Sequence, residues 1–189
     1  MSQLRMFIAV ETPESVAGQL QRLIARLQTI DAPVRWVKPT QMHWTIKFLG
    51  DVEMLETAQV CRRMQEVAAQ FEPIELTVQG LGAFPTVDRP RTLWIGSTTG
   101  NEAMEELHAA LDASLGVMGF NREQRRFTPH LTLGRVRGTK NIAQLNELLE
   151  AEAEFLAGSM WAEEMVLFSS DLQSTGPVYE VVGRAPFGK

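Results

Sequence analysis

The sequence predicts an α+β fold with two pseudo-symmetric lobes, each a mostly antiparallel sheet with helices on its outer face. Three observations favour this class. The order strand, helix, strand, helix, strand occurs in both halves of the chain. The middle strand of each half alternates polar and apolar residues, whereas central strands of a parallel sheet are apolar on both faces. The segment after the first strand, ETPE, lacks the glycines that a doubly wound nucleotide-binding sheet needs there.

The first half of the repeat, residues 5–84, opens on a short apolar strand and an amphipathic helix. Apolar residues recur in that helix at spacings of three and four, which places them on one face. The extended segment VRWV then leads to a strand in which large apolar residues occupy every second position. We expect strands at residues 6–10, 43–49 and 74–81, a helix that opens at Thr12 or Pro13, and another at about residues 53–69.

The second half, residues 91–184, repeats this order at a nearly constant offset. His130 follows His43 by 87 positions, and Asn141, the expected helix start, follows Glu53 by 88. A constant offset between unlike sequences indicates an old duplication, so we expect residues 1–189 to form one bilobal domain around a shared cleft. Strands are expected at residues 92–96, 130–136, 165–169 and 177–183, and helices at 101–115 and 141–155.

Composition and charge exclude several classes of protein. Hydrophobic residues make up 44% of the chain and charged residues 22%, as in an ordinary globular domain. The net charge of −5 argues against a protein that coats nucleic acid, because such binding needs broad positive surface. Five arginines between residues 122 and 137 could still form a local phosphate site, or a solvated charged loop. A single cysteine, Cys61, and no apolar run of membrane-spanning length predict a cytoplasmic protein without membrane partners.

The strongest chemical signal is a pattern that occurs twice, HWTI from residue 43 and HLTL from residue 130. Residues i and i+2 of a strand project from the same face, so Thr45 should lie beside His43, and Thr132 beside His130. The residue between them then points into the core. Since the repeat places the two strands equivalently, we expect a pseudo-two-fold axis to bring both polar pairs together across one cleft.

Two histidines and two threonines suit an in-line displacement at phosphorus. One neutral imidazole can take a proton from the attacking water while the other, protonated, gives one to the departing oxygen. The threonine hydroxyls can donate hydrogen bonds to the non-bridging phosphate oxygens. This scheme needs no metal or cofactor, and the sequence does not say which histidine is the acid and which is the base.

The segments QMHWTIKFLG and FTPHLTLGRV resemble the two motifs of the two-histidine phosphoesterases. The stretches RMFIAVETPE, VRWVKPTQ, LGAFP, LWIG and SSDLQSTGPVYEVV are similar to one branch of them, the RNA 2′,3′-cyclic phosphodiesterases of the 2′-5′ RNA ligase family. The resemblance covers nearly the whole chain. One departure is Trp44, where the family often has an aliphatic residue; we expect it to change packing and not chemistry.

The resemblance implies hydrolysis of a 2′,3′-cyclic phosphodiester at an RNA end to a 2′-phosphomonoester. It assigns His43 as proton donor to the leaving 3′-oxygen and His130 as the base that activates water. The partner would be RNA with a cyclic phosphate end, such as tRNA fragments or small cyclic nucleotides, with no obligate protein partner. Two alternatives stay open: 2′-5′ RNA ligation as the physiological direction, and a non-catalytic module that binds RNA ends, which the acidic charge and the paired histidines weaken.

Two further residues are candidates for phosphate contact. The family motif places an arginine at Arg135, although strict alternation from His130 would point it to the opposite face. Either the strand bulges or ends after Leu133, aided by Gly134, or Arg135 is structural. Lys47 shares alternation with His43, so it could contact phosphate or simply be solvated.

The remaining histidine and aromatic residues are expected to be structural. His108 lies in a helical run without a threonine partner and should be a surface or hydrogen-bonded helix residue. Phe127 could stack on a base or pack in the core, and Tyr179 could line the cleft. Cys61 should be a buried, unreactive helix residue, and its spacing to the histidines does not suit a metal site.

Overall fold

One antiparallel sheet of nine strands runs through the whole molecule in the computed structural model, which describes residues 3–173 and 176–188. The strand order is β7-β4-β5-β6-β3-β1-β8-β9, and β2 also pairs with β6. The two strands with histidine motifs, β3 and β6, therefore meet at the middle of the sheet. The strands are β1 (Gln3–Glu11), β2 (Val34–Trp36), β3 (His43–Glu53), β4 (Ile74–Thr86), β5 (Arg89–Ser97), β6 (Leu131–Val136), β7 (Leu156–Ala162), β8 (Glu164–Gln173) and β9 (Gly176–Pro186).

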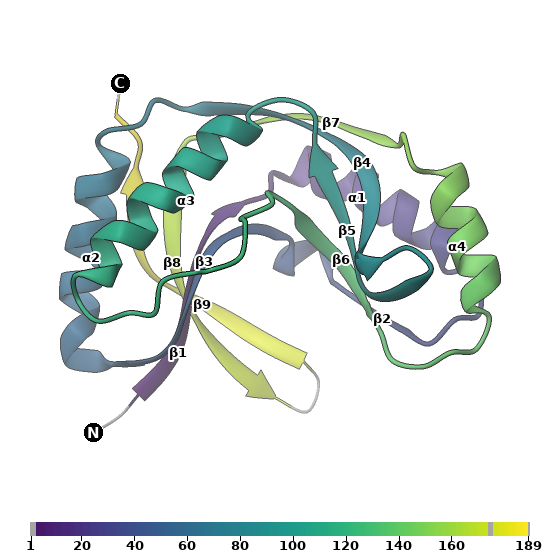
Figure 1. Cartoon of the computed structure of the whole chain (residues 1–189), viewed down its shortest axis with the longest axis horizontal. Helices are drawn as coiled ribbons and strands as arrows, with labels where there is room; N and C mark the ends of the chain where they lie inside the picture. Colours follow the sequence, from purple (N-terminus) through teal and green to yellow (C-terminus); the bar gives the residue numbers. More distant parts are fainter. Residues whose placement is uncertain (1–2, 174–175, 189) are drawn as a thin grey trace.

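Helices cover the outer side of this sheet on two flanks (Figure 1). Helices α2 and α3 pack on the lobe made of β3, β1, β8 and β9, whereas α1 and α4 pack on the lobe made of β6, β5, β4 and β7. The predicted α+β class with antiparallel sheets and outer helices is confirmed. No helix in the described chain combines the length and apolarity that a bilayer span requires. The helices are α1 (Glu14–Leu27), α2 (Met54–Ala68), α3 (Asn101–Gly116), α4 (Ile142–Ala151) and the short 3-10 helix η1 (Pro39–Gln41).

The two lobes do not coincide with the two halves of the sequence. Strand β4 belongs to the first half but pairs with β5 and β7 of the second half. Strand β8 belongs to the second half but pairs with β1. Each half of the sequence thus contributes strands to both lobes. The boundary between the two halves of the repeat is therefore not the boundary between the lobes.

The seam between the lobes is a pair of buried side chains. Trp44 of β3 lies directly opposite Leu131 of β6, and both are fully buried. The prediction that these intervening residues point into the core is therefore confirmed. The indole Nε1–H of Trp44 has no hydrogen-bond partner among the described residues, so its burial is driven by apolar area alone.

Each histidine strand contains a β-bulge at the same place in its motif. In β3, Thr45 and Lys47 pair with successive residues of β1, which leaves Ile46 as the extra residue. In β6, Thr132 and Gly134 pair with successive residues of β5, which leaves Leu133 as the extra residue. A bulge reverses the alternation of the residues that follow it, so the residues after each threonine change face.

The sequence prediction differs from the structure near residue 155. The helix expected at residues 141–155 ends at Ala151, and strand β7 follows it without having been predicted. β7 lies at the edge of the sheet and pairs only with β4. Its sequence, LAGSMWA, contains a glycine and small residues, which weakens the apolar alternation that identifies a strand.

Replacement of Trp44 by alanine should destabilise the protein by about 3–5 kcal/mol, because it opens a cavity at the seam. Trp44→Phe should cost much less, since it keeps most of the apolar volume and removes the unpaired N–H. Urea denaturation measures both free energies of unfolding. Trp161→Ala on edge strand β7, where the side chain is 57% exposed, is the matched control. Equal losses for Trp44→Ala and Trp161→Ala would contradict a structural role of the seam.

Candidate functional site

The four residues of the two His-x-Thr motifs share one face of the sheet, which we call the histidine face. Trp44 pairs with Leu131 in an antiparallel register. If this register is extended by one residue on each side, His43 is set across from Thr132, and Thr45 across from His130. The two histidines are then diagonal neighbours, with about 7–8 Å between their positions. The structure therefore brings together two imidazoles that lie far apart in the sequence, at a separation that one phosphate group can bridge.

Both imidazoles are held in the same tautomer. The Nδ1–H of His43 donates to the carbonyl oxygen of Gln41 at 2.8 Å, and the Nδ1–H of His130 donates to that of Thr128 at 2.7 Å. A carbonyl oxygen only accepts, so Nδ1 carries the proton in each ring. The Nε2 atom of each histidine is consequently the one that can exchange a proton with a bound molecule.

The protein environment disfavours the charged form of both histidines. Burial lowers the pKa of His43 from its ordinary 6.5 to about 4; the hydrogen bond to Gln41 opposes this shift, and the charge of His130 adds to it. Burial also lowers the pKa of His130, against the hydrogen bond to Thr128 and with the help of the positive charge of Arg135. Both rings are therefore neutral at pH 7 when no anion is bound.

Aromatic rings enclose each histidine and account for this desolvation. Phe7 lies 4.8 Å from the His43 ring, and Tyr179 packs edge-on against it at 5.4 Å, between ring centroids. The possibility that Tyr179 lines the cleft therefore agrees with its position beside His43. Sequence reasoning missed the other rings, because an aromatic residue on a strand is usually read as core. The rings beside His130 are Phe84 at 5.0 Å and Trp94 at 6.2 Å.

The bulge at Leu133 brings Arg135 to the histidine face. Arg135 is exposed, and its positive charge adds to the effect of burial in lowering the pKa of His130. Burial raises the pKa of Tyr179, and the charge of Arg135 opposes that rise. Of the alternatives left open for Arg135, the structure has the bulge, with Leu133 as the extra residue, and the strand continues to Val136. The bulge resolves the conflict between the alternation of the strand and the family motif. The guanidinium of Arg135 also lies 3.5 Å from the hydroxyl of Thr92 on the neighbouring strand.

The equivalent bulge at Ile46 has the opposite consequence for Lys47. The side chain turns into the interior, where it is 5% exposed and its Nζ donates to Asp112 at 2.5 Å and to the carbonyl oxygen of Asn121 at 2.9 Å. The prediction that Lys47 shares a face with His43 is wrong, because the bulge reverses the alternation. Lys47 is fully engaged by these partners and does not reach the histidine face.

Helix α3 connects this bulge to the loop before His130. His108 donates its Nδ1–H to the carbonyl oxygen of Ile46 at 2.8 Å and stacks on Phe127 at 4.3 Å. Asp112, one turn further along α3, accepts from the backbone N–H of Glu123 at 3.1 Å. The interpretation of His108 as a hydrogen-bonded helix residue is confirmed, and its ring covers one face of Phe127.

Two of the five arginines in the segment from residue 122 to 137 form such local contacts. Arg122 pairs with Asp112, and Arg126 pairs with Glu105, both on α3. The segment is therefore not one phosphate patch, and Arg135 is its member at the histidine face. Sequence reasoning passed over another arginine, Arg35, which lies on β2 directly opposite Arg135. The extended segment VRWV before the first motif was its only signal.

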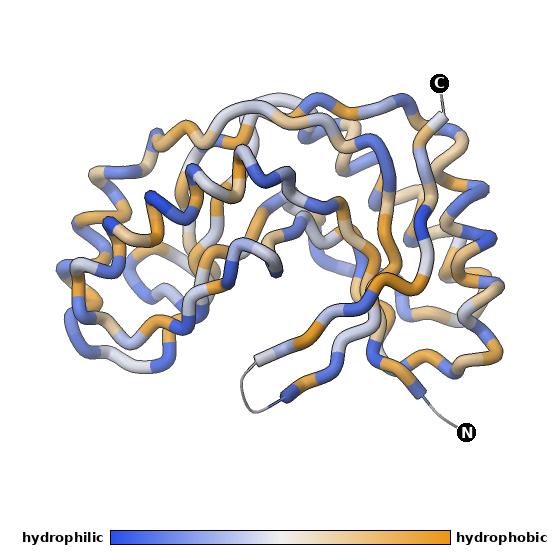
Figure 2. The backbone as a smooth tube through the Cα atoms, turned by 180° about the vertical axis from the view of Figure 1, so that it is seen from behind, coloured by the Kyte–Doolittle hydropathy of each residue, from blue (hydrophilic) through white to orange (hydrophobic). Residues whose placement is uncertain are grey.

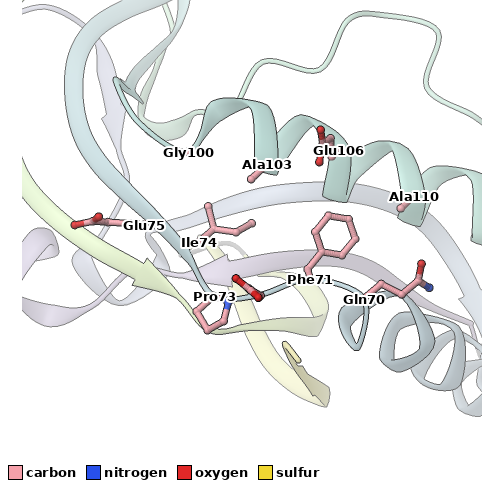
Figure 3. A pocket seen from close by; sticks show the side chains of 10 residues that line it. Gln70, Phe71, Pro73, Ile74, Glu75, Gly100, Ala103, Glu106 and Ala110 are labelled. Atoms are coloured by element: carbon pink, nitrogen blue, oxygen red, sulfur yellow. The ribbon is translucent and has the colours of Figure 1, made fainter. Parts of the chain in front are cut away.

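A cavity of about 600 Å³ lies away from the histidines, between the end of α2, the start of β4 and helix α3 (Figure 3). Glu72, Glu75 and Glu106 line it, and none of its lining residues is basic. Such a lining would repel a phosphate group, so this cavity does not compete with the histidine face as a site for RNA ends. Within residues 3–173 and 176–188, no cluster of three or more His, Cys, Asp or Glu side chains could hold a metal.

Comparisons with known proteins identify relatives along the whole chain. A family model described as the 2′-5′ RNA ligase superfamily matches residues 12–173. A Methanothermobacter thermautotrophicus protein named RNA 2′,3′-cyclic phosphodiesterase is 34% identical over 94% of this chain and 95% of its own. An Aquifex aeolicus protein of the same name is 33% identical over 96% of both chains.

Solved structures show the same fold. The crystal structure of TT0787 of Thermus thermophilus superposes with a TM-score of 0.83 at 24% identity, covering 98% of this chain and 100% of the other. The structure of E. coli LigT complexed with 3′-AMP superposes with a TM-score of 0.77 at 20% identity, covering 100% of both chains. At this identity the likeness concerns the fold.

The buried neutral histidines should make the protein less stable in acid. Between pH 6.5 and 4 the unfolded chain takes up a proton at residue 43 while the native chain does not, so the free energy of unfolding should fall by about 3 kcal/mol from this group alone. His43→Gln should remove that part of the loss. Urea denaturation at several pH values measures it, with Arg22→Gln on the outer side of α1 as control. Parallel pH profiles for the wild type and His43→Gln would contradict the shift.

Proposed function

The chain belongs to the 2′-5′ RNA ligase superfamily, and from this premise we propose that His43 and His130 catalyse the hydrolysis of 2′,3′-cyclic phosphate at RNA ends. Its relatives over nearly the whole chain carry the name RNA 2′,3′-cyclic phosphodiesterase, which supports this activity. The observation that carries the proposal is the pair of diagonal imidazoles, each with Nδ1 bound to a carbonyl and Nε2 free.

The reaction we propose is a single in-line displacement. His130 Nε2 takes a proton from water as the water oxygen bonds to phosphorus, and the bond from phosphorus to the 3′-oxygen breaks. His43 Nε2 gives its proton to that oxygen, so the product carries a 3′-hydroxyl and a 2′-phosphomonoester. The order of these roles follows the family resemblance, since the two hydrogen-bonding arrangements are alike. In this proposal the hydroxyls of Thr45 and Thr132 donate to the non-bridging oxygens.

Substrate binding favours protonation of His43, which takes up its proton from the solvent. A cyclic phosphate carries one negative charge, and a nearby anion favours the imidazolium form of histidine. Its arrival between the rings therefore raises the low pKa of His43 from about 4, so that the ring is charged more often with substrate than without it. The positive charge of Arg135 favours the same anion and, together with burial, keeps His130 neutral, as a base must be.

The ligation of RNA ends in 2′-5′ linkage is the reverse chemistry, with a sugar hydroxyl in the place of water. The curated relatives carry the phosphodiesterase name, so hydrolysis is the direction that we propose. A cytoplasmic location is part of the same proposal, because the single cysteine allows no internal disulfide. RNA ends and small nucleotides with a cyclic phosphate are the proposed substrates.

Replacement of either histidine should abolish most turnover. His43→Ala and His130→Ala should each reduce kcat by about 10²–10⁴-fold, as expected for loss of a general acid or base. The assay follows conversion of a 2′,3′-cyclic-phosphate RNA to product in the presence of EDTA, which should not lower the wild-type rate. Arg22→Gln serves as control, and circular dichroism checks the fold. Near-normal turnover in either histidine variant would refute the two-histidine mechanism, and a 3′-phosphate product would reverse the proposed regiochemistry.

The pH dependence should reflect the lowered pKa values. Since kcat/KM reports the free protein, and both imidazoles titrate below 6.5, its bell-shaped profile should peak below pH 6.5. The profile of kcat should peak at higher pH, because the bound phosphate stabilises the imidazolium. Steady-state rates from pH 4 to 9 test both curves, and the two apparent pKa values belong to the coupled pair. A kcat/KM maximum above pH 7 would contradict the neutral state of the free histidines.

A further inference from the structure

Two arginines lie directly opposite each other at the edge of the histidine face. Arg35 of β2 pairs in register with Arg135 of β6, and Thr92 of β5 pairs with Arg135 from the other side. Residues directly opposite across an antiparallel ladder project from the same face of the sheet. The three side chains therefore form a row across three strands, and the bulge at Leu133 places this row on the same face as the histidines.

The arrangement is electrostatically unfavourable as it stands. Like charges in directly opposite positions destabilise a strand pair. In the part of the chain that the structure describes, neither guanidinium has a carboxylate partner within 4 Å, whereas Arg26, Arg122 and Arg184 each have one. An anion between Arg35 and Arg135 would relieve this repulsion, and guanidinium groups bind phosphate oxygens through paired N–H donors.

Arg35 lies against the hairpin of β8 and β9, which projects from the concave side of the molecule (Figures 1 and 2). The backbone of Gly176 lies so close that a Cβ there would be 2.9 Å from the Arg35 guanidinium. Gln41 Nε2 donates to the carbonyl oxygen of Pro177 at 2.5 Å, which holds the hairpin against the segment between β2 and β3. Arg35 is thus enclosed on one side by backbone and has its partner Arg135 on the other.

The row of Arg35, Arg135 and Thr92 lies close to the proposed reaction centre. Thr132 and Arg135 are three residues apart on β6, which corresponds to about 10 Å along an extended strand. The hairpin residue Tyr179 packs edge-on against His43. Tyr179 also lies near Arg35 and Arg135: burial raises the pKa of its hydroxyl, and the positive charges of the two arginines oppose that rise. The two arginines are therefore close enough to the histidines for one end of a nucleotide bound there to reach Arg35.

We propose that Arg35, together with Arg135, binds the phosphodiester that joins the terminal nucleotide to the one before it. This inference rests on the proposed function, and it names the substrate class: oligonucleotide ends in preference to cyclic mononucleotides. A mononucleotide 2′,3′-cyclic phosphate has no such phosphodiester. Arg35 is then a specificity-determining residue, whereas Arg135 also lies close enough to His130 to act on the reacting phosphate.

The test compares two substrates that differ by one internal phosphate. The wild type should open the cyclic phosphate of the adenosine dinucleotide ApA with higher kcat/KM than that of adenosine 2′,3′-cyclic phosphate. Arg35→Gln should lower kcat/KM for the dinucleotide at least tenfold, mainly through KM, and change the mononucleotide value less than about twofold. Arg35→Lys should recover part of the loss, because it restores the charge but not the paired donors. Arg22→Gln, which removes one charge on α1, should leave both substrates unchanged.

Salt and product binding give readouts that a purely structural role of Arg35 would not move. Calorimetric binding of the dinucleotide 2′-phosphate should lose about 0.7 from its logarithmic salt slope in Arg35→Gln, the value for one contact to single-stranded nucleic acid. Binding of adenosine 2′-phosphate should keep its slope.

Equal losses on both nucleotides, or no loss on either, would overturn the inference about Arg35. Failure of the wild type to open either cyclic phosphate would instead reject the proposed function, and the binding comparison would still decide the role of Arg35.

Discussion

The pairing of Trp44 with Leu131 is the contact on which the site depends. It fixes the register of β3 against β6, and a slip of either strand by one residue would turn the histidine and threonine of that strand toward the core. The pair also closes the seam between lobes that have each taken a strand from the other half of the chain. Register, burial and the exchange of β4 and β8 therefore act together: the same packing that stabilises the sheet sets the distance between the imidazoles.

From this seam the electrostatics of the site follow. Aromatic rings on both sides exclude water from the imidazoles, and backbone carbonyls hold both Nδ1 protons. A neutral, desolvated pair is poised to respond to an anion, because a negative charge in such surroundings changes the protonation state far more than it would in water. In the proposed mechanism the imidazolium need not be present before the substrate binds, because the negative charge of the bound phosphate favours its formation.

The sequence predicts which side chains share a face of a strand, because that follows from strand alternation. It does not predict which strands pair with each other over long distances in the chain. The partnership of His43 with Thr45, and of His130 with Thr132, follows from period two and is found in the structure. The exchange of β4 leaves no local trace, since a strand does not record its partner. The prediction for Lys47 is wrong for a specific reason: a bulge was considered as one alternative near Leu133 but not near Ile46. The constant offset between the halves relates these two positions. The internal repeat, applied consistently, would have moved Lys47 off the histidine face.

The two copies of the motif have diverged in what surrounds them, and the proposed reaction requires this. A displacement that uses one acid and one base cannot run on two equivalent imidazoles. The shared bulge sends Arg135 to the surface beside His130, while the equivalent position of the first half carries Phe48, which is 64% exposed. Aromatic rings surround both histidines, and His130 lies in addition next to the fixed positive charge of Arg135. The repeated backbone arrangement gives both histidines a free Nε2 atom. The different side chains at the equivalent positions 48 and 135 make the two histidines chemically distinct.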